Sequence, residues 1–284
     1  MRIIDEPRAM QAWADAARAA GRRIALVPTM GALHDGHLEL MRQGRARADE
    51  VVVSIFVNPI QFDRRDDFEK YPRTLDADAA RCREAGVDAI YAPSAGAMYP
   101  EGFHTAVDVS HLTEPLCGAQ RPGHFRGVTT VVTKLFHAVR PHVAVFGEKD
   151  FQQLAVVRRM TADLDFGIDV VGVPTVREAD GLALSSRNQR LAPEARIAAR
   201  CVPRALGAAV EAVRVGETRA AAVVDRAARV IAAEPQARLE YAELRDPETL
   251  DGVAEVRGPA LLALAVWVGG VRLIDNRILG GTNP

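Results

Sequence analysis

The sequence predicts an α/β protein with a parallel sheet and a smaller α+β domain at its carboxyl end. Over the first two-thirds of the chain, short apolar runs alternate with helical patterns, which is typical of a parallel sheet covered on both faces by helices. These runs are almost wholly apolar, as expected for strands buried on both sides. Beyond about residue 177 the pattern changes to two alanine-rich helices followed by three strand-like runs.

The predicted elements follow one another in a regular order. The strands of the first domain are predicted at residues 23–27, 51–57, 89–92, 143–146 and 168–173. Helices are predicted at residues 76–84, 128–139 and 151–162, and a further helix is expected to start near Asp35, after Pro28 and Gly31 break the first strand. The second domain is predicted to contain helices at 194–213 and 219–233, and strands at 238–245, 261–268 and 271–274. We therefore predict domains at residues 1–176 and 177–284.

Composition narrows the class of protein. The 284 residues are 48% hydrophobic and 26% charged, enough to bury one large core or two modest ones. The net charge is only −1 and no long basic run occurs, so we expect no nucleic-acid partner. No apolar run approaches the roughly 20 residues that span a bilayer, and the chain lacks the pattern of a signal peptide, so we expect neither membrane insertion nor export. The widely spaced Cys82, Cys117 and Cys201 favour a reducing cytoplasm over a disulfide framework.

Two histidines three residues apart, His34 and His37, stand where the first strand gives way to a helix. The first turn of a helix has unpaired backbone N–H groups and the positive end of the helix dipole, so it attracts anions. An imidazole, with a pKa of about 6.5, adds a donor that a phosphate can use. We interpret the pair as phosphate-binding, with Gly31 and Gly36 allowing close approach. A zinc-binding pair and two incidental polar residues remain open as alternatives.

A second candidate is Lys149, in the run GlyGluLysAsp at residues 147–150. This run follows the predicted strand 143–146 and precedes a predicted helix. Ligands of open parallel sheets bind at the carboxyl ends of strands, near the point where the strand order reverses. We interpret Lys149 as a polyphosphate-binding side chain. The alternative is a surface lysine paired with Glu148 or Asp150.

Residues 180–188 are expected to form a flexible stretch between the domains that contains Ser185, Ser186 and Arg187. Hydroxyl groups and a guanidinium suit phosphate oxygens whose charge shifts during a reaction. A mobile loop of this kind could close over a ligand. The alternative is a solvated linker with a helix cap.

Further polar residues have weaker local signals. His124 and Arg126 lie between glycines just before a predicted helix and suggest another anion site. Gln61 follows the second predicted strand and suits a hydroxyl or carboxylate, although a lone glutamine is usually structural. Asp76 and Asp78, at a helix start, are interpreted as partners of the helix dipole rather than as ligands of a divalent ion. No CxxC pair, GxSxG elbow or Walker loop occurs, so cysteine or serine nucleophilic chemistry is poorly supported.

Six blocks, in this order, resemble the pantothenate synthetase family of pantoate–β-alanine ligases. They are PTMGALHDGH at 28–37, FVNPIQF at 56–62, YPRT at 71–74, RPGHFRGV at 121–128, GEKDFQQ at 147–153 and DGLALSSRN at 180–188, and RLIDN at 272–276 extends the resemblance nearly to the carboxyl end. A single HxGH motif is shared by many nucleotidylyltransferases and class I aminoacyl-tRNA synthetases, whereas six blocks in order are highly specific.

The resemblance implies a Rossmann-like sheet of the HxGH nucleotidylyltransferase type, a smaller carboxyl-terminal lid and a cytoplasmic homodimer. It implies ATP as co-substrate with Mg²⁺, and pantoate and β-alanine as substrates. The catalytic residues would be His37, as an acid-like donor, with His34, Lys149 and Arg187. Gln61 would contact both substrates and Gln153 would contact pantoate, with His124 and Arg126 as further substrate contacts. The ATP-binding residues would be Met30, Gly31, Ala32, Leu33, His34, Asp35, Gly36, His37, Gly147, Glu148, Lys149, Asp150, Val176, Leu184, Ser185, Ser186 and Arg187.

The sequence therefore predicts an ATP-dependent ligase that forms pantothenate through a pantoyl adenylate, with residues 180–188 closing over that intermediate. One alternative is an adenylyltransferase that moves AMP to a phosphate-bearing acceptor, which would require additional cations near the glutamines. Another is a nucleotide-sensing or RNA-binding module without catalysis. The near-neutral charge and the lack of an aromatic basic surface argue against RNA.

Overall fold

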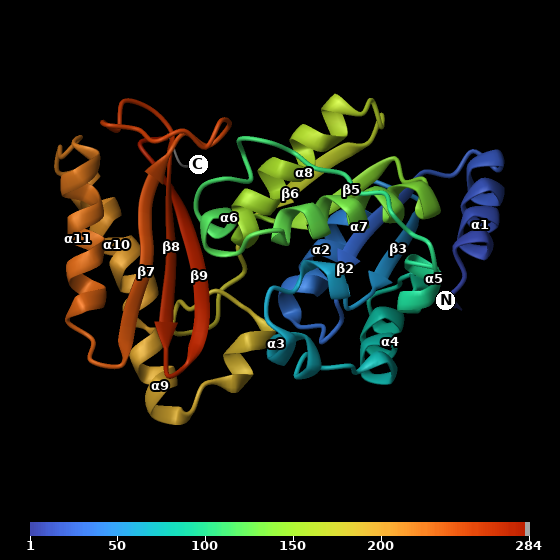
Figure 1. Ribbon diagram of the computed structural model, residues 1–284, viewed down its shortest axis with the longest axis horizontal. Helices are drawn as coiled ribbons and strands as arrows, with labels where there is room; N and C mark the ends of the chain where they lie inside the picture. The colour runs from blue at the N-terminus through green and yellow to red at the C-terminus, as the bar shows by residue number, and fades with distance from the viewer. Residues whose placement is uncertain (282–284) are drawn as a thin grey trace. The chain divides into compact units, whose positions relative to one another are not determined.

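A six-stranded parallel sheet organises the first part of the computed structural model, which describes residues 1–281 (Figure 1). The order of its strands is β1-β4-β3-β2-β5-β6. Their bounds are β1 Arg2–Ile4, β2 Ile24–Thr29, β3 Glu50–Ile55, β4 Ala89–Tyr91, β5 Val143–Gly147 and β6 Asp169–Val173. The central strands are buried on both faces, which explains their runs of valine, isoleucine and leucine.

The strand order reverses between β2 and β5. The chain first moves outward from β2 through β3 to β4, and then returns to add β5 on the other side of β2. Strands β2 and β5 pair directly and in parallel, with Ala25 opposite Val143 and Leu26 opposite Ala144. Their carboxyl ends therefore meet at one edge of the sheet, at the position where ligands bind in open α/β folds.

Helices cover both faces of this sheet. Residues of α2 and α4 pack with Ala25 and Val27 of β2 in one buried cluster, whereas α1 and α7 pack against each other and against β2. Gly44 of α2 faces the sheet, and a Cβ added to it would lie only 3.3 Å from Cβ of Ala25. The glycine therefore allows this helix to approach the sheet closely. The helices are α1 Pro7–Ala19, α2 Asp35–Arg45, α3 Arg65–Glu69, α4 Leu75–Glu84, α5 Ala95–Met98, α6 Cys117–Gln120, α7 His124–Val139 and α8 Phe151–Asp163, with 3₁₀ turns η1 Pro59–Gln61 and η2 Glu148–Asp150.

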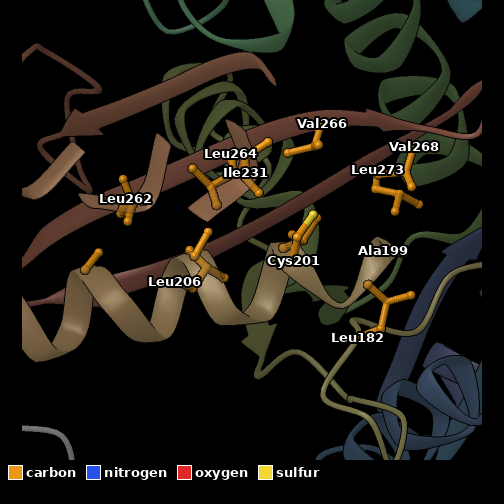
Figure 2. Packing of buried hydrophobic residues seen from close by; sticks show 14 of the residues in the cluster. Leu182, Ala199, Cys201, Leu206, Ile231, Leu262, Leu264, Val266, Val268 and Leu273 are labelled. Carbon is orange, nitrogen blue, oxygen red and sulfur yellow. The ribbon is translucent and has the colours of Figure 1, made fainter. Parts of the chain in front are cut away.

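The second structural unit is an antiparallel sheet with helices on one face (Figure 1). Its elements are η3 Ser186–Arg190, α9 Pro193–Ala199, α10 Cys201–Arg214, α11 Ala220–Ala232, β7 Ala237–Arg245, β8 Ala260–Val268 and β9 Val271–Leu279, and the strand order is β7-β8-β9. Figure 2 shows its core, in which Cys201 and Leu206 of α10 lie beside side chains of β8 such as Leu264. A two-residue turn joins β8 to β9, and its residues Gly269 and Gly270 both have positive φ, as a tight hairpin turn requires.

Contacts divide the chain slightly differently from the predicted domains. The first unit comprises residues 1–148 and 156–174, and the second comprises Lys149–Ala155 together with the chain from Thr175 onward. Lys149 and the first turn of α8 therefore belong with the carboxyl-terminal sheet, although the sequence prediction grouped them with the amino-terminal domain. Each unit is described separately below.

The predicted fold class is confirmed, and all five predicted strands of the first domain are present to within two residues. Some elements differ from the prediction. Strand β1 and helix α1 were not predicted, and α7 begins at His124, so His124 and Arg126 lie within this helix rather than before it. The predicted helix 194–213 is interrupted at Arg200, and β9 continues to Leu279 through Asp275, Asn276 and Arg277. The polar residues of β9 do not match the pattern of a buried strand. Asp275 is nevertheless buried, because it forms an ion pair with Arg177, which lies far away in the sequence.

Candidate functional site

The loop after β2 turns sharply before α2 begins at Asp35, as the sequence predicted. Gly31 has φ +83° and Ala32 has φ +51°, so two successive residues adopt the left-handed conformation. That conformation costs a residue with a side chain, such as Ala32, roughly 1–2 kcal/mol. Surrounding contacts must therefore hold the loop in place.

Asp78 of α4 provides these contacts. Its Oδ2 accepts a hydrogen bond from the backbone N–H of Ala32 at 3.0 Å, and its Oδ1 accepts one from Leu33 at 2.8 Å. The hydroxyl of Thr74 donates to the same carboxylate at 3.0 Å. Asp78 is only 2% exposed, and a Cβ on Gly31 would lie 2.9 Å from its Oδ2. Asp78 thus shapes the loop, which is a role beyond the helix-dipole interpretation made from the sequence.

The two histidines at the start of α2 lie side by side. Their ring centroids are 4.1 Å apart, and the backbone N–H of His34 donates to Nδ1 of His37 at 3.2 Å. Because that Nδ1 accepts, the neutral ring of His37 has its proton on Nε2. Nε2 of His37 is therefore a hydrogen-bond donor.

Gln61 lies in a chain of hydrogen bonds in the first unit. Its Nε2 is 3.2 Å from Sδ of Met30, and its Oε1 accepts from Nδ2 of Asn58 at 2.9 Å. Asn58 is 1% exposed and its Oδ1 accepts from the hydroxyl of Tyr99 at 2.8 Å. Burial raises the pKa of Tyr99, which keeps this phenol protonated and able to donate. Sequence analysis missed Asn58 and Tyr99, which together fix the orientation of the Gln61 amide.

His124 also contacts Gln61, through the main chain. The carbonyl oxygen of Gln61 accepts from His124 Nδ1 at 2.8 Å, and a Cβ on Gly127 would lie 2.4 Å from the carbonyl oxygen of Ile60. Gly127 therefore lets α7 pack against the turn η1. Arg126 instead forms an exposed ion pair with Asp108 at 3.8 Å.

The carboxyl end of β5 bears the second predicted run. Gly147 ends the strand and Glu148 follows it, at the same sheet edge as the loop after β2. The next residue, Lys149, has a side chain that is 18% exposed, with its ammonium group 3.7 Å from Oδ2 of Asp150. Gln153 is half-buried in the first turn of α8. The ion pair of the alternative interpretation is thus present, but the lysine is mostly buried rather than a surface residue.

Residues 176–184 form a hydrogen-bonded hairpin, which leads into the 3₁₀ turn η3 at Ser186. The backbone N–H of Leu184 donates to the carbonyl of Val176 at 2.9 Å. At its end, Ser185 Oγ accepts from the backbone N–H of Arg187 at 3.3 Å. The carboxylate of Glu178 accepts from Asn188 at 2.7 Å and pairs with Arg196 at 2.8 Å, which fixes the hairpin to the second unit.

The candidate residues are divided between the two structural units. Met30, His34, His37, Gln61 and His124 belong to the first unit, and Lys149, Asp150, Gln153, Val176 and Leu184–Arg187 belong to the second. Within residues 1–281, no group of three or more histidine, cysteine, aspartate or glutamate side chains is arranged to hold a metal ion. The zinc alternative for His34 and His37 therefore lacks further ligands. Over the same residues, no helix is long and apolar enough to cross a membrane.

Comparison with known proteins identifies the family. The family described as "Pantoate-beta-alanine ligase" matches residues 2–278. The chain belongs to the pantoate–β-alanine ligase family. Its relatives include the pantothenate synthetase of Geobacter sulfurreducens, which is 56% identical over 280 residues covering 99% of each chain, and that of Heliobacterium modesticaldum, which is 54% identical over 279 residues covering 98% of this chain and 99% of the relative.

Solved structures of the same ligase family have the same fold. The pantothenate synthetase of Thermus thermophilus superposes with a TM-score of 0.91 at 46% identity, covering 98% of this chain and 99% of the other. The pantoate–β-alanine ligase of Francisella tularensis, described as complexed with β,γ-ATP and β-alanine, has a TM-score of 0.80 at 30% identity and covers 98% of this chain and 97% of its own.

Proposed function

We propose that the protein condenses pantoate with β-alanine to form pantothenate, with ATP converted to AMP and pyrophosphate through a pantoyl adenylate. One observation carries the proposal. The chain is a member of the ligase family, and its strands β2 and β5 pair where the strand order of the sheet reverses. The loop that bears His34 and His37 follows β2, and the run that leads into Lys149 follows β5. Phosphates bind at this position in open α/β folds because helix N-termini and loop N–H groups converge there.

In the proposed first step, a carboxylate oxygen of pantoate attacks the α-phosphorus of ATP and pyrophosphate leaves with the bonding electrons. In the second step, the neutral amine of β-alanine attacks the acyl carbon, AMP leaves, and the amide nitrogen loses a proton. Activation is needed because a free carboxylate has a poor leaving group. The adenylate expels AMP readily.

The proposed role of the protein is mainly to supply position and charge. His37, through Nε2, would donate to a phosphate oxygen, and His34, Lys149 and Arg187 would stabilise the charge that builds on the phosphates. Loss of one such donor typically reduces the rate by about 10²–10³-fold. The other nucleotide contacts proposed are the remaining residues of 30–37 and 147–150, together with Val176 and residues 184–186.

For the organic substrates, we propose that the amide of Gln61 binds pantoate and β-alanine and that Gln153 binds pantoate, with His124 and Arg126 as further contacts. The hydrogen bond from Asn58 to Gln61 Oε1 supports this role, because it fixes the orientation of the amide. Nε2 of Gln61 is then directed toward Met30, one of the residues proposed to bind ATP. Neutral amides orient a carboxylate without a positive charge that would reduce its nucleophilicity.

Mg²⁺ is proposed to accompany ATP. Magnesium bound with a nucleotide takes most of its ligands from phosphates and water, so it would be held mainly by the ATP that the proposed residues bind. Its chemical contribution would be to neutralise phosphate charge. We also propose a homodimer in the cytoplasm, which sedimentation of the purified protein and fractionation of the native host would test.

The test of function is AMP formation from ATP, pantoate and β-alanine, with each component omitted in turn. The proposal expects AMP to form only when all three substrates are present. It also expects labelled pyrophosphate to exchange into ATP when pantoate is present and β-alanine is omitted. Transfer of AMP to a phosphate-bearing acceptor in place of pantoate would instead support an adenylyltransferase. ATP binding without turnover of any acceptor would support a sensing module.

A further inference from the structure

The run Arg272–Asn276 in β9 resembles the family, yet none of the roles proposed above uses it. Two neighbouring residues in this run, Asp275 and Asn276, bind segments that contain proposed site residues. Both segments lie in the second unit with β9, so these contacts belong to one structural body.

Asp275 binds the hairpin 176–184 at its first strand. Arg177 forms a two-pronged ion pair with the Asp275 carboxylate, with N–O distances of 2.7 Å and 2.9 Å, and also donates to the carbonyl of Gly181 at 3.0 Å. The Asp275 side chain is only 1% exposed, whereas that of Arg177 is 25% exposed. Removing Arg177 would leave a buried carboxylate without this partner, which is costly. The pair fixes the strand and the turn of the hairpin together.

Asn276 binds the other segment. Its Nδ2 donates to the main-chain carbonyl of Lys149 at 2.9 Å. This bond sets the main chain at the residue whose ammonium group is proposed to meet the phosphates. An aspartate at position 276 would have almost the same shape but could not donate to a carbonyl oxygen.

The two contacts lie on opposite faces of the carboxyl-terminal sheet. Asp275 is paired with Leu264 on the face that α10 covers, and Asn276 is paired with Ala263 on the other face. We propose that Asp275 and Asn276 are positioning residues, which hold the hairpin that leads into Ser185–Arg187 and the main chain of Lys149 in a fixed spatial relationship. The proposal rests on the proposed function, because it concerns groups assigned to the phosphates.

A purely structural role is the competing explanation, and the two differ in what they predict. Loss of positioning lowers kcat, because charge stabilisation in the transition state depends on placement to within about 1 Å. Loss of stability alone lowers the melting temperature while the folded fraction keeps its kcat. The tests below therefore measure both properties on each variant.

The first test compares Asn276→Asp with Arg277→Ala, an exposed neighbour on the same strand. We expect Asn276→Asp to lower kcat by about 10²-fold with little change in the KM for ATP, because a small displacement of a reacting group has an effect of this size. Hydrogen exchange of residues 148–155 should become faster in this variant and stay unchanged in the control. Wild-type kcat together with unchanged exchange in Asn276→Asp would overturn the role of Asn276.

The second test replaces the buried pair by apolar residues, as Arg177→Met with Asp275→Leu. A well-packed apolar pair commonly preserves stability, whereas removing one partner does not. We expect the double variant to melt near the wild-type temperature and still to have a kcat reduced by about 10²-fold. Recovery of wild-type kcat would show that the pair only stabilises the fold. Hydrogen exchange needs no substrate, so it tests positioning even if the wild-type protein forms no AMP and the proposed function fails.

Discussion

The backbone N–H of His34 donates a hydrogen bond to Nδ1 of His37, with 3.2 Å between the nitrogen atoms. This contact uses Nδ1 of His37 to satisfy the amino-terminal end of α2, so Nε2 is the nitrogen that carries the proton of the neutral ring. The two ring nitrogens of His37 therefore have different tasks, and substitutions can separate them.

We predict that His37→Asn retains stability and loses activity. The Asn Oδ1 lies close to the position of Nδ1 and can accept the same hydrogen bond, but nothing replaces Nε2, so the rate should fall by about 10²–10³-fold. His37→Ala should instead lose about 0.5–2 kcal/mol in unfolding free energy, because it leaves no side-chain acceptor for the backbone N–H of His34. Urea denaturation and AMP formation measured on both variants test this. Equal stability of the two variants would contradict the capping role.

Lys149→Ala is predicted to lower pantoate-dependent pyrophosphate release by at least about 10²-fold, since it removes a charge proposed to meet the phosphates. The matched control is Lys70→Ala, because Lys70 is an exposed lysine at the end of α3. Its activity should match the wild type. Near wild-type isotope exchange between pyrophosphate and ATP in Lys149→Ala would discredit the assigned role.

Asp78→Ala should destabilise the protein by about 2–4 kcal/mol, because the N–H groups of Ala32 and Leu33 lose their acceptor in a buried loop. Asp76→Ala provides the control: Asp76 lies in the same helical turn but is exposed, so its loss should cost no more than about 0.3–1 kcal/mol. Denaturant unfolding measures both. A similar small loss in the two variants would mean that Asp78 does not hold the loop.

Gly127→Ala is predicted to destabilise the fold by about 1–3 kcal/mol through overpacking, because the new methyl group would overlap the main chain of η1. Displacement of η1 should also move Gln61 and raise the KM for pantoate. In contrast, Gly207→Ala in α10 should stabilise by about 0.5–1 kcal/mol, since nothing lies within 4 Å of the added Cβ and alanine favours a helix. Thermal melts measure the stability of both variants, and pantoate titrations measure the KM. An unchanged KM for pantoate in Gly127→Ala would contradict the proposal that displacement of η1 moves Gln61.

Stability should decrease below about pH 6.5 because of His142. Its Nδ1 accepts a hydrogen bond from the backbone N–H of Ile24 at 3.0 Å, and burial, followed by the charges of Arg18 and Arg23, lowers its pKa from the ordinary 6.5. The unfolded chain then binds the proton more readily than the folded chain, so this stabilisation is complete above the unfolded pKa and is lost as the pH falls.

His142→Asn keeps an acceptor for Ile24 but does not titrate in this range. Urea unfolding between pH 5 and 8, a range chosen about the ordinary histidine pKa, should therefore show a weaker acid dependence for the variant than for the wild type. Parallel curves would exclude His142 as the source.

The proposed site residues with the strongest sequence signal are those that follow strands. His34, His37 and Lys149 each come after an apolar run that ends in glycine or proline and at or just before the start of a helix. Asp78 has no comparable signal: its partners Ala32 and Leu33 lie about 45 residues earlier, and its local pattern matches an ordinary first helical turn. Asn58 and Tyr99 were missed for the same reason.

The sequence could not predict the contacts that hold residues 180–188, because local composition describes only the segment itself. The residues that hold it, Arg196 and Asp275, come from α9 and β9 and could not be paired with it from spacing. Small polar residues in sequence are compatible with either a mobile loop or a well-held one. The difference depends on tertiary partners, which periodicity does not report.

The contacts of Asp275 and Asn276 depend on the number of residues that precede them in β9. Side chains of a strand alternate between the two faces, so one residue inserted between Val271 and Ile274 would move each following side chain to the opposite face. The Asp275 carboxylate would then face the carbonyl oxygen of Lys149, and Ile274 would take its place beside the Arg177 guanidinium. An inserted pair would preserve the alternation. The Arg272–Asn276 segment is thus constrained in length as well as in composition, although it is expected never to touch a substrate.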